Sequence, residues 1–372
     1  MIKGKNFNSL QHLPRVLIAP LDWGLGHATR CIPVILSLLN HGCVVIIAAD
    51  GAIKNLLQKE FPALEFADCK GYEMQYSRHK GWFMAKLFLQ FPKLLNRVRA
   101  EKRWLKTAIE KYKIDAVISD NRLGMSNKTI TSIYITHQLL IKTGNGFLNR
   151  LAQKIHYHYI NKYNACWVPD WGVDENLAGD LSHPVKLPAV PVTYIGPLSR
   201  FKKYEVPLKY DCCCIISGPE PQRSIFENII LHQVHECNYK VVIVRGLPQQ
   251  TILPSIKNPQ VTIINHLPSA EMCMLVQQSK IIISRSGYST IMDLVTQQKK
   301  AVLVPTPGQT EQEYLAKYLG NKKLFKAVNQ NDFCLADVLK QVDEFSFSTI
   351  HSSGNNLDDA IKNFVAGSLV NQ

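Results

Sequence analysis

A histidine follows two closely spaced glycines near the start of the sequence. Gly24, Gly26 and His27 come directly after an apolar run, and a helix is expected from Thr29. Such glycines allow a tight turn, and the next helix offers free N–H groups to an anion. The spacing is Gly-x-Gly-His rather than Gly-x-Gly-x-x-Gly, so it does not indicate NAD binding. We interpret His27 as a candidate general base and the two glycines as acceptor contacts; a histidine that only ends a helix is the alternative.

A carboxylate from further along the chain is predicted to lie beside this histidine. Asp120 ends the fourth predicted strand, and strands one and four are neighbours in a doubly wound sheet of order 3-2-1-4-5. Asp120 would then orient His27 and stabilise its protonated ring, although it could instead cap a turn. His137 and Gln138 end the fifth predicted strand on the same rim. They are candidate acceptor contacts, with a purely structural role as the alternative.

A first turn in the second half could hold a phosphorylated ligand. Ser217, Gly218 and Arg223 follow an apolar run and precede a predicted helix. The helix N-terminus attracts anions, and an arginine can bond phosphate oxygens in fork geometry. These three residues are therefore candidate donor contacts. The alternative is an ordinary proline-rich connection.

A second turn of the same kind carries more candidates. Ser286, Gly287 and Tyr288 lead into a helix whose amides can point at phosphate or sugar oxygens. Asp293, one turn into that helix, could accept hydrogen bonds from both hydroxyls of a ribose. Gln312 follows a flexible loop further on, and its amide suits the hydroxyls of a sugar.

All these candidates lie at the ends of short apolar runs that alternate with longer helical stretches. Several runs are apolar throughout, as expected for parallel strands covered on both faces, so the pattern predicts an α/β protein. The predicted strands are Arg15–Pro20, Val44–Ala49, Leu64–Asp68, Asp115–Asp120, Ser132–His137, Ala165–Pro169, Tyr194–Leu198, Asp211–Ser217, Lys240–Arg245, Val261–Asn265, Lys280–Ser284, Ala301–Pro305 and Leu324–Val328. The predicted helices are Thr29–Asn40, Ala52–Lys59, Phe83–Tyr112 (with a break at Pro92 left open), Leu148–Lys162, Ser224–Cys237, Ser269–Gln278, Ser289–Gln297, Glu311–Leu319 and Leu357–Leu369.

The length and the repeated alternation predict two domains. A chain of 372 residues is too long for one ordinary core. A segment rich in proline at residues 191–209 reads as a linker between an acceptor domain at residues 1–190 and a donor domain at residues 210–372. We expect two Rossmann-like domains that face each other across a cleft, with the last helix able to cross back.

The charge balance favours an anionic partner. Lysine and arginine total 43 against 29 acidic residues, a net charge of +14, which suits phosphate groups, nucleic acid or an acidic membrane surface. No nucleic-acid-binding motif is present. The ten cysteines include no C-x-x-C pair, so neither a zinc ribbon nor thioredoxin chemistry is indicated, and free thiols fit a reducing cytoplasm. With neither a signal peptide nor a long apolar stretch, we expect a cytoplasmic protein, soluble or peripheral.

One segment combines large apolar side chains with cations. It runs from Trp82 to Trp104 and continues to Lys106. Such a helix can sit on anionic lipid, where it would bring the protein to a lipid-linked acceptor at the inner face of the plasma membrane. A core helix whose other face carries solvated lysines is an equal alternative.

The second half resembles the C-terminal domain of family 28 glycosyltransferases, the group that includes MurG. The resemblance is carried by Ser284-Arg285-Ser286-Gly287, Asp293, the run Ala301–Pro305 and Gln312, and it is clear over Val261–Leu319. The Gly-x-Gly-His loop of the first half is similar to that family's acceptor loop. The resemblance implies the GT-B fold, a UDP-sugar donor and inverting transfer without a metal or other cofactor. Consistently, no Asp-x-Asp triplet occurs.

The resemblance also implies roles for single residues. Asp293 takes the place of the family's ribose-binding glutamate, Gln312 that of a glutamine at the donor sugar, and His27 that of the loop histidine proposed as base. The family's glycine- and serine-rich loop is replaced here by the turn from Ser217 to Arg223, which transfers phosphate contact to Arg223. A nucleotide-sugar hydrolase of the same fold and a binding protein without turnover are the alternatives to a transferase.

Overall fold

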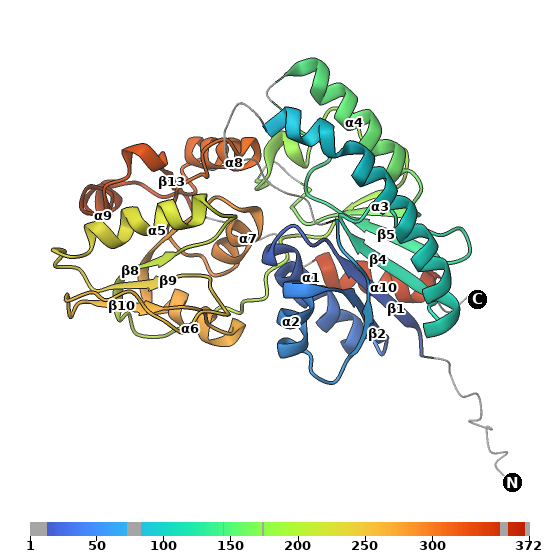
Figure 1. The fold of residues 1–372 in the computed structure, drawn as a ribbon, viewed down its shortest axis with the longest axis horizontal. Coiled ribbons are helices and arrows are strands. Elements are labelled where there is room, and N and C mark those ends of the chain that lie inside the picture. Colours follow the sequence, from blue (N-terminus) through green and yellow to red (C-terminus); the bar gives the residue numbers. More distant parts are fainter. Residues whose placement is uncertain (1–12, 73–82, 144, 173–174, 350–355, 369–372) are drawn as a thin grey trace, which may run out of the picture.

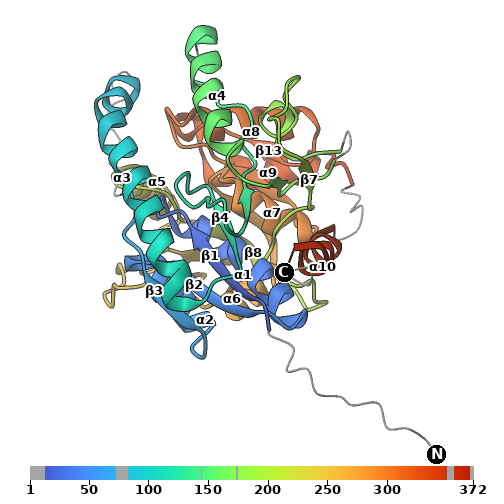
Figure 2. The same cartoon turned by 90° about the vertical axis from the view of Figure 1, so that its right-hand side faces the viewer.

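The computed structural model describes residues 13–72, 83–143, 145–172, 175–349 and 356–368. Within them the chain forms two α/β domains that lie side by side, each built on a parallel sheet flanked by helices (Figures 1 and 2). The predicted pair of Rossmann-like domains is confirmed.

The first sheet is parallel throughout and has the order β3-β2-β1-β4-β5-β6-β7. Its strands are β1 (Arg15–Pro20), β2 (Val44–Ala49), β3 (Glu65–Asp68), β4 (Ala116–Asp120), β5 (Thr131–Ile135), β6 (Ala165–Val168) and β7 (Val192–Tyr194). Strand β1 shows why the apolar runs are continuous: Val16 and Ile18 enter one core cluster, while Leu17 and Ala19 enter another on the opposite face. The order reverses direction at β1 and β4, and there Pro20 is paired with Asp120.

The second sheet is also parallel, in the order β10-β9-β8-β11-β12-β13. Its strands are β8 (Tyr210–Ile215), β9 (Val241–Val244), β10 (Val261–Ile264), β11 (Ser279–Ser284), β12 (Ala301–Leu303) and β13 (Lys326–Ala327). Because β8, β11 and β12 are adjacent, the loops that follow them leave the same edge of the sheet side by side.

Helices connect and cover the strands. They are α1 (Leu25–Asn40), α2 (Gly51–Glu60), α3 (Phe83–Tyr112), α4 (Gly146–Ile160), α5 (Gln222–Gln233), α6 (Ser269–Gln277), α7 (Tyr288–Thr296), α8 (Thr310–Asn321), α9 (Leu335–Glu344) and α10 (Asn356–Ser368). Helix α3 continues through Pro92 without a break in its span. Within the described residues, no helix is both long and apolar enough to cross a bilayer.

Three elements differ from the sequence-based expectation. Helix α1 begins at Leu25, four residues earlier than expected, so His27 lies in its first turn rather than in a preceding loop. Strand β7 falls inside the predicted linker yet pairs with β6, and it therefore extends the first sheet beyond residue 190. Helix α9 was not predicted, although its buried residues (Leu335, Val338, Leu339 and Val342) have the spacing of an amphipathic helix.

The two domains are packed together through helices. One apolar cluster includes residues of α1 from the first domain and of α7 from the second. The last helix, α10, returns to the first domain (Figure 1), where Ser37 donates a hydrogen bond to Asp358 at 3.0 Å and Phe364 packs edge-on against Trp167. Helix α10, which follows the second domain in the chain, thus packs on the first.

Candidate active site between the domains

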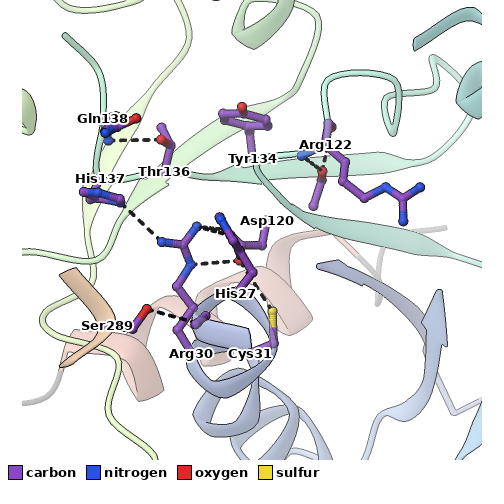
Figure 3. A network of polar contacts seen from close by, with 12 residues as sticks. His27, Arg30, Cys31, Asp120, Arg122, Tyr134, Thr136, His137, Gln138 and Ser289 are labelled. Atoms are coloured by element: carbon purple, nitrogen blue, oxygen red, sulfur yellow. Dashed lines mark hydrogen bonds and ion pairs between the residues drawn. The ribbon is translucent and has the colours of Figure 1, made fainter. Parts of the chain in front are cut away.

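The first turn of α1 meets the end of β4 at the reversal point of the first sheet. Gly24 precedes the helix with a φ of 123°, in the region that favours glycine, and so lets the chain turn directly from β1 into α1. The turn places His27 over the end of β4, where its Nδ1 lies 2.9 Å from Oδ2 of Asp120 (Figure 3). The strand order therefore brings these two residues together; a catalytic role remains a prediction.

A third charged group, which the sequence analysis missed, joins this pair. Arg30 lies one helical turn after His27 and is 3% exposed. Its Nε donates to Oδ2 of Asp120 at 2.8 Å, and its Nη2 donates to Oδ1 of the same carboxylate (Figure 3). The predicted helix began at Thr29, after His27, so the three-residue spacing that puts both side chains on one helical face did not mark Arg30.

The charges of this cluster shift the pKa values of its members. Burial would raise the pKa of Asp120, but the charges of Arg30 and then His27, with their hydrogen bonds, lower it to about 2. Burial and then the charge of Arg30 lower the pKa of His27, against the raising effect of Asp120. The aspartate is therefore ionised and the histidine neutral near pH 7, as a general base requires.

His137 and Gln138 connect the cluster to the second domain through hydrogen bonds to one glutamate. The Nε2 atom of His137 lies 2.7 Å from Oε1 of Glu311 on α8, and the side chain of Gln138 donates to the other oxygen of that carboxylate. The ring of His137 stacks on Tyr288 of α7 with centroids 4.2 Å apart. These two candidate acceptor residues thus contact the second domain directly, through a glutamate that was not predicted from the sequence.

A close backbone approach locks α1 against α7. The Oγ of Ser289 donates to the carbonyl oxygen of Gly26 at 3.0 Å (Figure 3), and a Cβ added at Gly26 would lie only 2.8 Å from that Oγ. A side chain at residue 26 would therefore push the Ser289 hydroxyl out of this contact. This contact places His27 next to the N-terminus of α7.

Three loops of the second domain converge at the edge of its sheet. Ser217 and Gly218 lie after β8, Ser286 and Gly287 lie after β11, and the loop after β12 leads to Gln312. The loops after β11 and β12 are tied together, because Ser286 donates to the carbonyl oxygen of Gln312 at 2.8 Å and Gln312 accepts from the Thr306 amide at 2.9 Å. The N-termini of α5, α7 and α8 therefore face one region, which suits an anion.

Arg223 does not have the position that the sequence analysis expected of a phosphate ligand. It is 7% exposed and enclosed by two carboxylates, with Nε 2.6 Å from Glu220 and Nη2 2.8 Å from Glu227. Its Nη1 donates to the carbonyl oxygen of Arg245 at 3.0 Å. Its charge is therefore already balanced within the protein, and its contacts order the start of α5.

Arg285 offers the positive charge that Arg223 does not. It is 1% exposed, and its donors reach the backbone oxygens of Val304, Pro305 and Gln222, and the side chain of Gln330. Among the described residues no carboxylate forms an ion pair with it. Burial lowers the pKa of Arg285 to about 10, which still leaves it charged at neutral pH. A cation without a counter-charge thus lies behind all three converging loops.

Asp293 lies in a small pocket beside the interdomain connection. Ser199 donates to its Oδ1 at 2.7 Å, and Nε of Arg200 lies 3.9 Å from its Oδ2. Within the described part of the chain, this Nε has no hydrogen-bond partner. The pocket is also lined by Phe201, Ile215, Met272, Val276, Thr290 and Leu294. Burial raises the pKa of Asp293 to about 6, against Arg200 and Ser199. Arg200 was missed because the segment after β7 was read as a linker.

The comparisons with known proteins agree with this architecture. Residues 213–363 match the glycosyltransferase family 28 C-terminal domain. The chain is 24% identical over 327 residues, 80% of its length and 81% of the relative's, to a protein of Methanosarcina acetivorans described as an uncharacterized glycosyltransferase. It is 25% identical over 154 residues, 41% of its length and 43% of the relative's, to the UDP-N-acetylglucosamine–N-acetylmuramyl-(pentapeptide) pyrophosphoryl-undecaprenol N-acetylglucosamine transferase of a Sulfurihydrogenibium species.

Solved structures share the fold at low sequence identity. The glycosyltransferase of kitacinnamycin aligns with a TM-score of 0.62 at 14% identity, covering 95% of this chain and 94% of its own. MurG of Acinetobacter baumannii aligns with a TM-score of 0.50 at 15% identity, covering 94% and 93%. The fold and the family domain define a GT-B glycosyltransferase. More particularly, residues 213–363 belong to the C-terminal domain of glycosyltransferase family 28.

Proposed function

We propose that this glycosyltransferase is an inverting, metal-independent enzyme that moves a sugar from a UDP-sugar to an acceptor hydroxyl. One observation carries the proposal: the contact between Gly26 and Ser289 sets the His27–Asp120 pair against the N-terminus of α7. A base on the acceptor side and an anion cradle on the donor side thereby meet at one place. Inverting transfer needs this arrangement, because the acceptor must attack opposite the leaving diphosphate.

Residues of the first domain activate the acceptor, and residues of the second domain stabilise the leaving group. The acceptor hydroxyl loses its proton to Nε2 of His27 while its oxygen bonds to the anomeric carbon. The bond from that carbon to the diphosphate oxygen breaks, and UDP leaves with the electron pair. The N-termini of α5, α7 and α8 and the charge of Arg285 stabilise the developing negative charge. Asp293 and Arg200 would receive the nucleoside, and Gln312 the sugar.

Product analysis tests the proposal and separates its alternatives. The protein is incubated with UDP-sugars, with and without cell-envelope lipid, in the presence of excess EDTA or magnesium. We expect UDP release that depends on the lipid and stays near the untreated rate in EDTA. Equal amounts of UDP and free sugar without acceptor would identify a hydrolase, and binding without any product a non-catalytic protein. Loss of turnover in EDTA with rescue by magnesium would overturn the metal-free mechanism.

Replacing Asp293 with asparagine should weaken donor binding but stabilise the folded protein at high pH. We expect Asp293→Asn to weaken UDP binding by about 1–3 kcal/mol, the range for an unpaired polar group. The folded protein keeps the proton of Asp293 up to about pH 6, whereas the ordinary pKa of an aspartate is 3.8. The free energy of unfolding therefore falls as the pH rises through this window. The variant should therefore be more stable than the wild type at pH 8 and not below pH 4.

Calorimetric titration with UDP and thermal unfolding at the two pH values measure these effects. Asp343→Asn, which removes an exposed carboxylate on α9, is the control and should change neither. Unchanged UDP affinity in Asp293→Asn would remove Asp293 from the donor site.

The surface that we propose to face the membrane starts from the segment Trp82 to Trp104, which lies in part outside the described residues. Trp82 and the side chains of residues 83–91 are not described. In the described remainder of the segment, Lys93, Arg99 and Arg103 are exposed, whereas Trp104 donates to the carbonyl oxygen of Asp68 at 2.9 Å and packs on the sheet. The core-helix alternative thus holds for this part of α3.

Helix α4 adds an apolar edge to the same surface. Its Phe147 is 75% exposed and Leu151 39% exposed, one turn apart on one face. In both views α4 and the start of α3 extend beyond the sheet on the same side (Figures 1 and 2). We propose that this side binds anionic lipid at the inner face of the plasma membrane and admits a lipid-linked acceptor.

Co-sedimentation with vesicles tests this surface. Binding to anionic vesicles should fall as salt rises, since each basic residue near the lipid contributes about 1 kcal/mol that salt screens. Phe147→Ser should weaken binding, and Ile225→Ser, at an exposed position on α5 of the other domain, should not. Equal binding to neutral vesicles, or binding to neither kind, would contradict the proposal.

A further inference from the structure

The guanidinium of Arg30 touches each polar side chain proposed for the acceptor site except Gln138. Its Nε and Nη2 hold the carboxylate of Asp120, its Nη2 lies 2.8 Å from Nδ1 of His27, and its Nη1 lies 3.3 Å from Nδ1 of His137. Every nitrogen of the group is thus engaged. The importance of Arg30 follows from these contacts.

The contacts of Arg30 restrict where the proton of His27 can be. Nδ1 of His27 faces both Asp120, which accepts, and Arg30, which can only donate. If Nδ1 carries the proton and donates to Asp120, Nε2 is left with a lone pair and can act as a base. If Nδ1 accepts from Arg30, Nε2 carries the proton and cannot. The base role therefore requires that Nδ1 donate to Asp120, a carboxylate that His27 shares with Arg30.

Arg30 also changes the charge that His27 experiences. In a simple histidine–aspartate pair the carboxylate stabilises the protonated ring. Here Arg30 balances that carboxylate through two hydrogen bonds and adds a positive charge beside the ring. The other groups that face His27 are His137 from the end of β5 and Glu311 from α8. The partly exposed Glu311 is the more distant of the two, because His137 lies between it and Arg30.

The second domain reaches Arg30 through His137. Since Arg30 donates to Nδ1 of His137, the proton of His137 must be on Nε2, which donates it to Glu311 at 2.7 Å. Tyr288 stacks on the same imidazole and holds its plane. The second domain thereby adds an indirect contact to a guanidinium that Asp120 already holds through two hydrogen bonds.

We propose that Arg30 is a positioning residue that keeps His27 unprotonated, so that the base stays available at pH values at which a simple histidine–aspartate pair would already hold its proton. The proposal rests on the base role proposed for His27. It assigns the acidic limb of the pH–rate profile to Arg30 rather than to the His27–Asp120 pair alone. The lowered pKa of His27, which follows from burial and from Arg30, is in the direction that this role requires.

Titration of His27 in the full-length protein tests the proposal without any substrate. The midpoint is read from the ring proton signals by nuclear magnetic resonance, and the His27 signal is assigned as the one missing in His27→Gln. We expect a wild-type midpoint below the ordinary value of 6.5. In Arg30→Met the midpoint should rise by about 1–3 pH units, the effect of a nearby opposite charge that is no longer balanced.

Two further variants serve as controls for the midpoint of His27. Arg30→Lys keeps a cation but cannot contact Asp120 and His27 with a fork, and its midpoint should lie between the other two. Arg15→Met removes an arginine that pairs with Glu65 far from the site and should leave the midpoint unchanged. If Arg30→Met does not fold, the wild-type and Arg30→Lys midpoints decide the matter.

The outcomes separate this proposal from the one on which it rests. A wild-type midpoint above 6.5, or an unchanged midpoint in folded Arg30 variants, would show that Arg30 is only structural and overturn the proposal. If the midpoint rises as expected, the acidic limb of turnover should move up with it. If the midpoint rises but His27→Gln retains full turnover, Arg30 controls His27 as proposed and the base role of His27 fails.

Discussion

His27→Gln should lower turnover by about 10²–10⁴-fold, the contribution of general base catalysis, and leave UDP affinity nearly unchanged. The reason for the separation is spatial: His27 belongs to α1 of the first domain, while Asp293 and the three converging loops belong to the second. Initial rates at saturating donor measure the first effect, and calorimetric titration with UDP the second. A loss of UDP affinity that matched the loss of turnover would place His27 in the donor site instead.

Asp120→Asn should cause a loss of similar order, and the two changes should not multiply. Residues that act as a unit are not additive, so the double variant should be scarcely worse than either single one. Asp120→Asn also leaves Arg30 buried without its counter-charge, so thermal unfolding must confirm that the variant is folded at the assay temperature. Multiplied losses, or a silent Asp120→Asn beside a damaging His27→Gln, would reduce Asp120 to a structural residue.

Glu101→Ala should destabilise the protein by about 3–5 kcal/mol, the cost of leaving one charge of a buried pair without its partner. Glu101 is 4% exposed and accepts from Nε of Arg122 at 2.7 Å, from the hydroxyl of Tyr72 at 2.7 Å and from the amide of Gly124 at 2.9 Å. These bonds hold α3 to the loop that follows β4. Asp120 ends that strand, so the carboxylate of Glu101 supports the site from behind.

Denaturant unfolding measures the loss, with Glu110→Ala, an exposed glutamate on the same helix, as the control. The control should change the free energy of unfolding by less than about 0.5 kcal/mol, as surface substitutions usually do. A loss in Glu101→Ala no larger than that of the control would mean that water or a rearranged Arg122 replaces the contact. Glu101→Gln should be milder, because it keeps one acceptor oxygen for Tyr72 or Gly124.

The amino-acid pattern alone predicts the two sheets, the family of the second domain and the meeting of His27 with Asp120. Strands such as β1 and β2 are apolar on both faces, and only burial under helices on both sides explains such runs. Parallel strands with crossover helices permit few topologies, so a residue at the end of β4 must lie beside the start of α1. The motif around Ser286 and Asp293 identified the family because it lies within one contiguous stretch.

Only the tertiary structure decided which charges are free and which are balanced. The sequence analysis selected Arg223 for phosphate, but Glu227 is one helical turn away on the same face and the fold adds Glu220, so its charge is neutralised within the protein. Arg285 became a candidate because its partners are backbone oxygens, which no sequence pattern marks. Glu311 and His137 form a hydrogen bond although they are 174 positions apart in the sequence. The pairing of His137 with Glu311 depends on how the two domains pack together, and the periodicity within each domain carries no information about that packing.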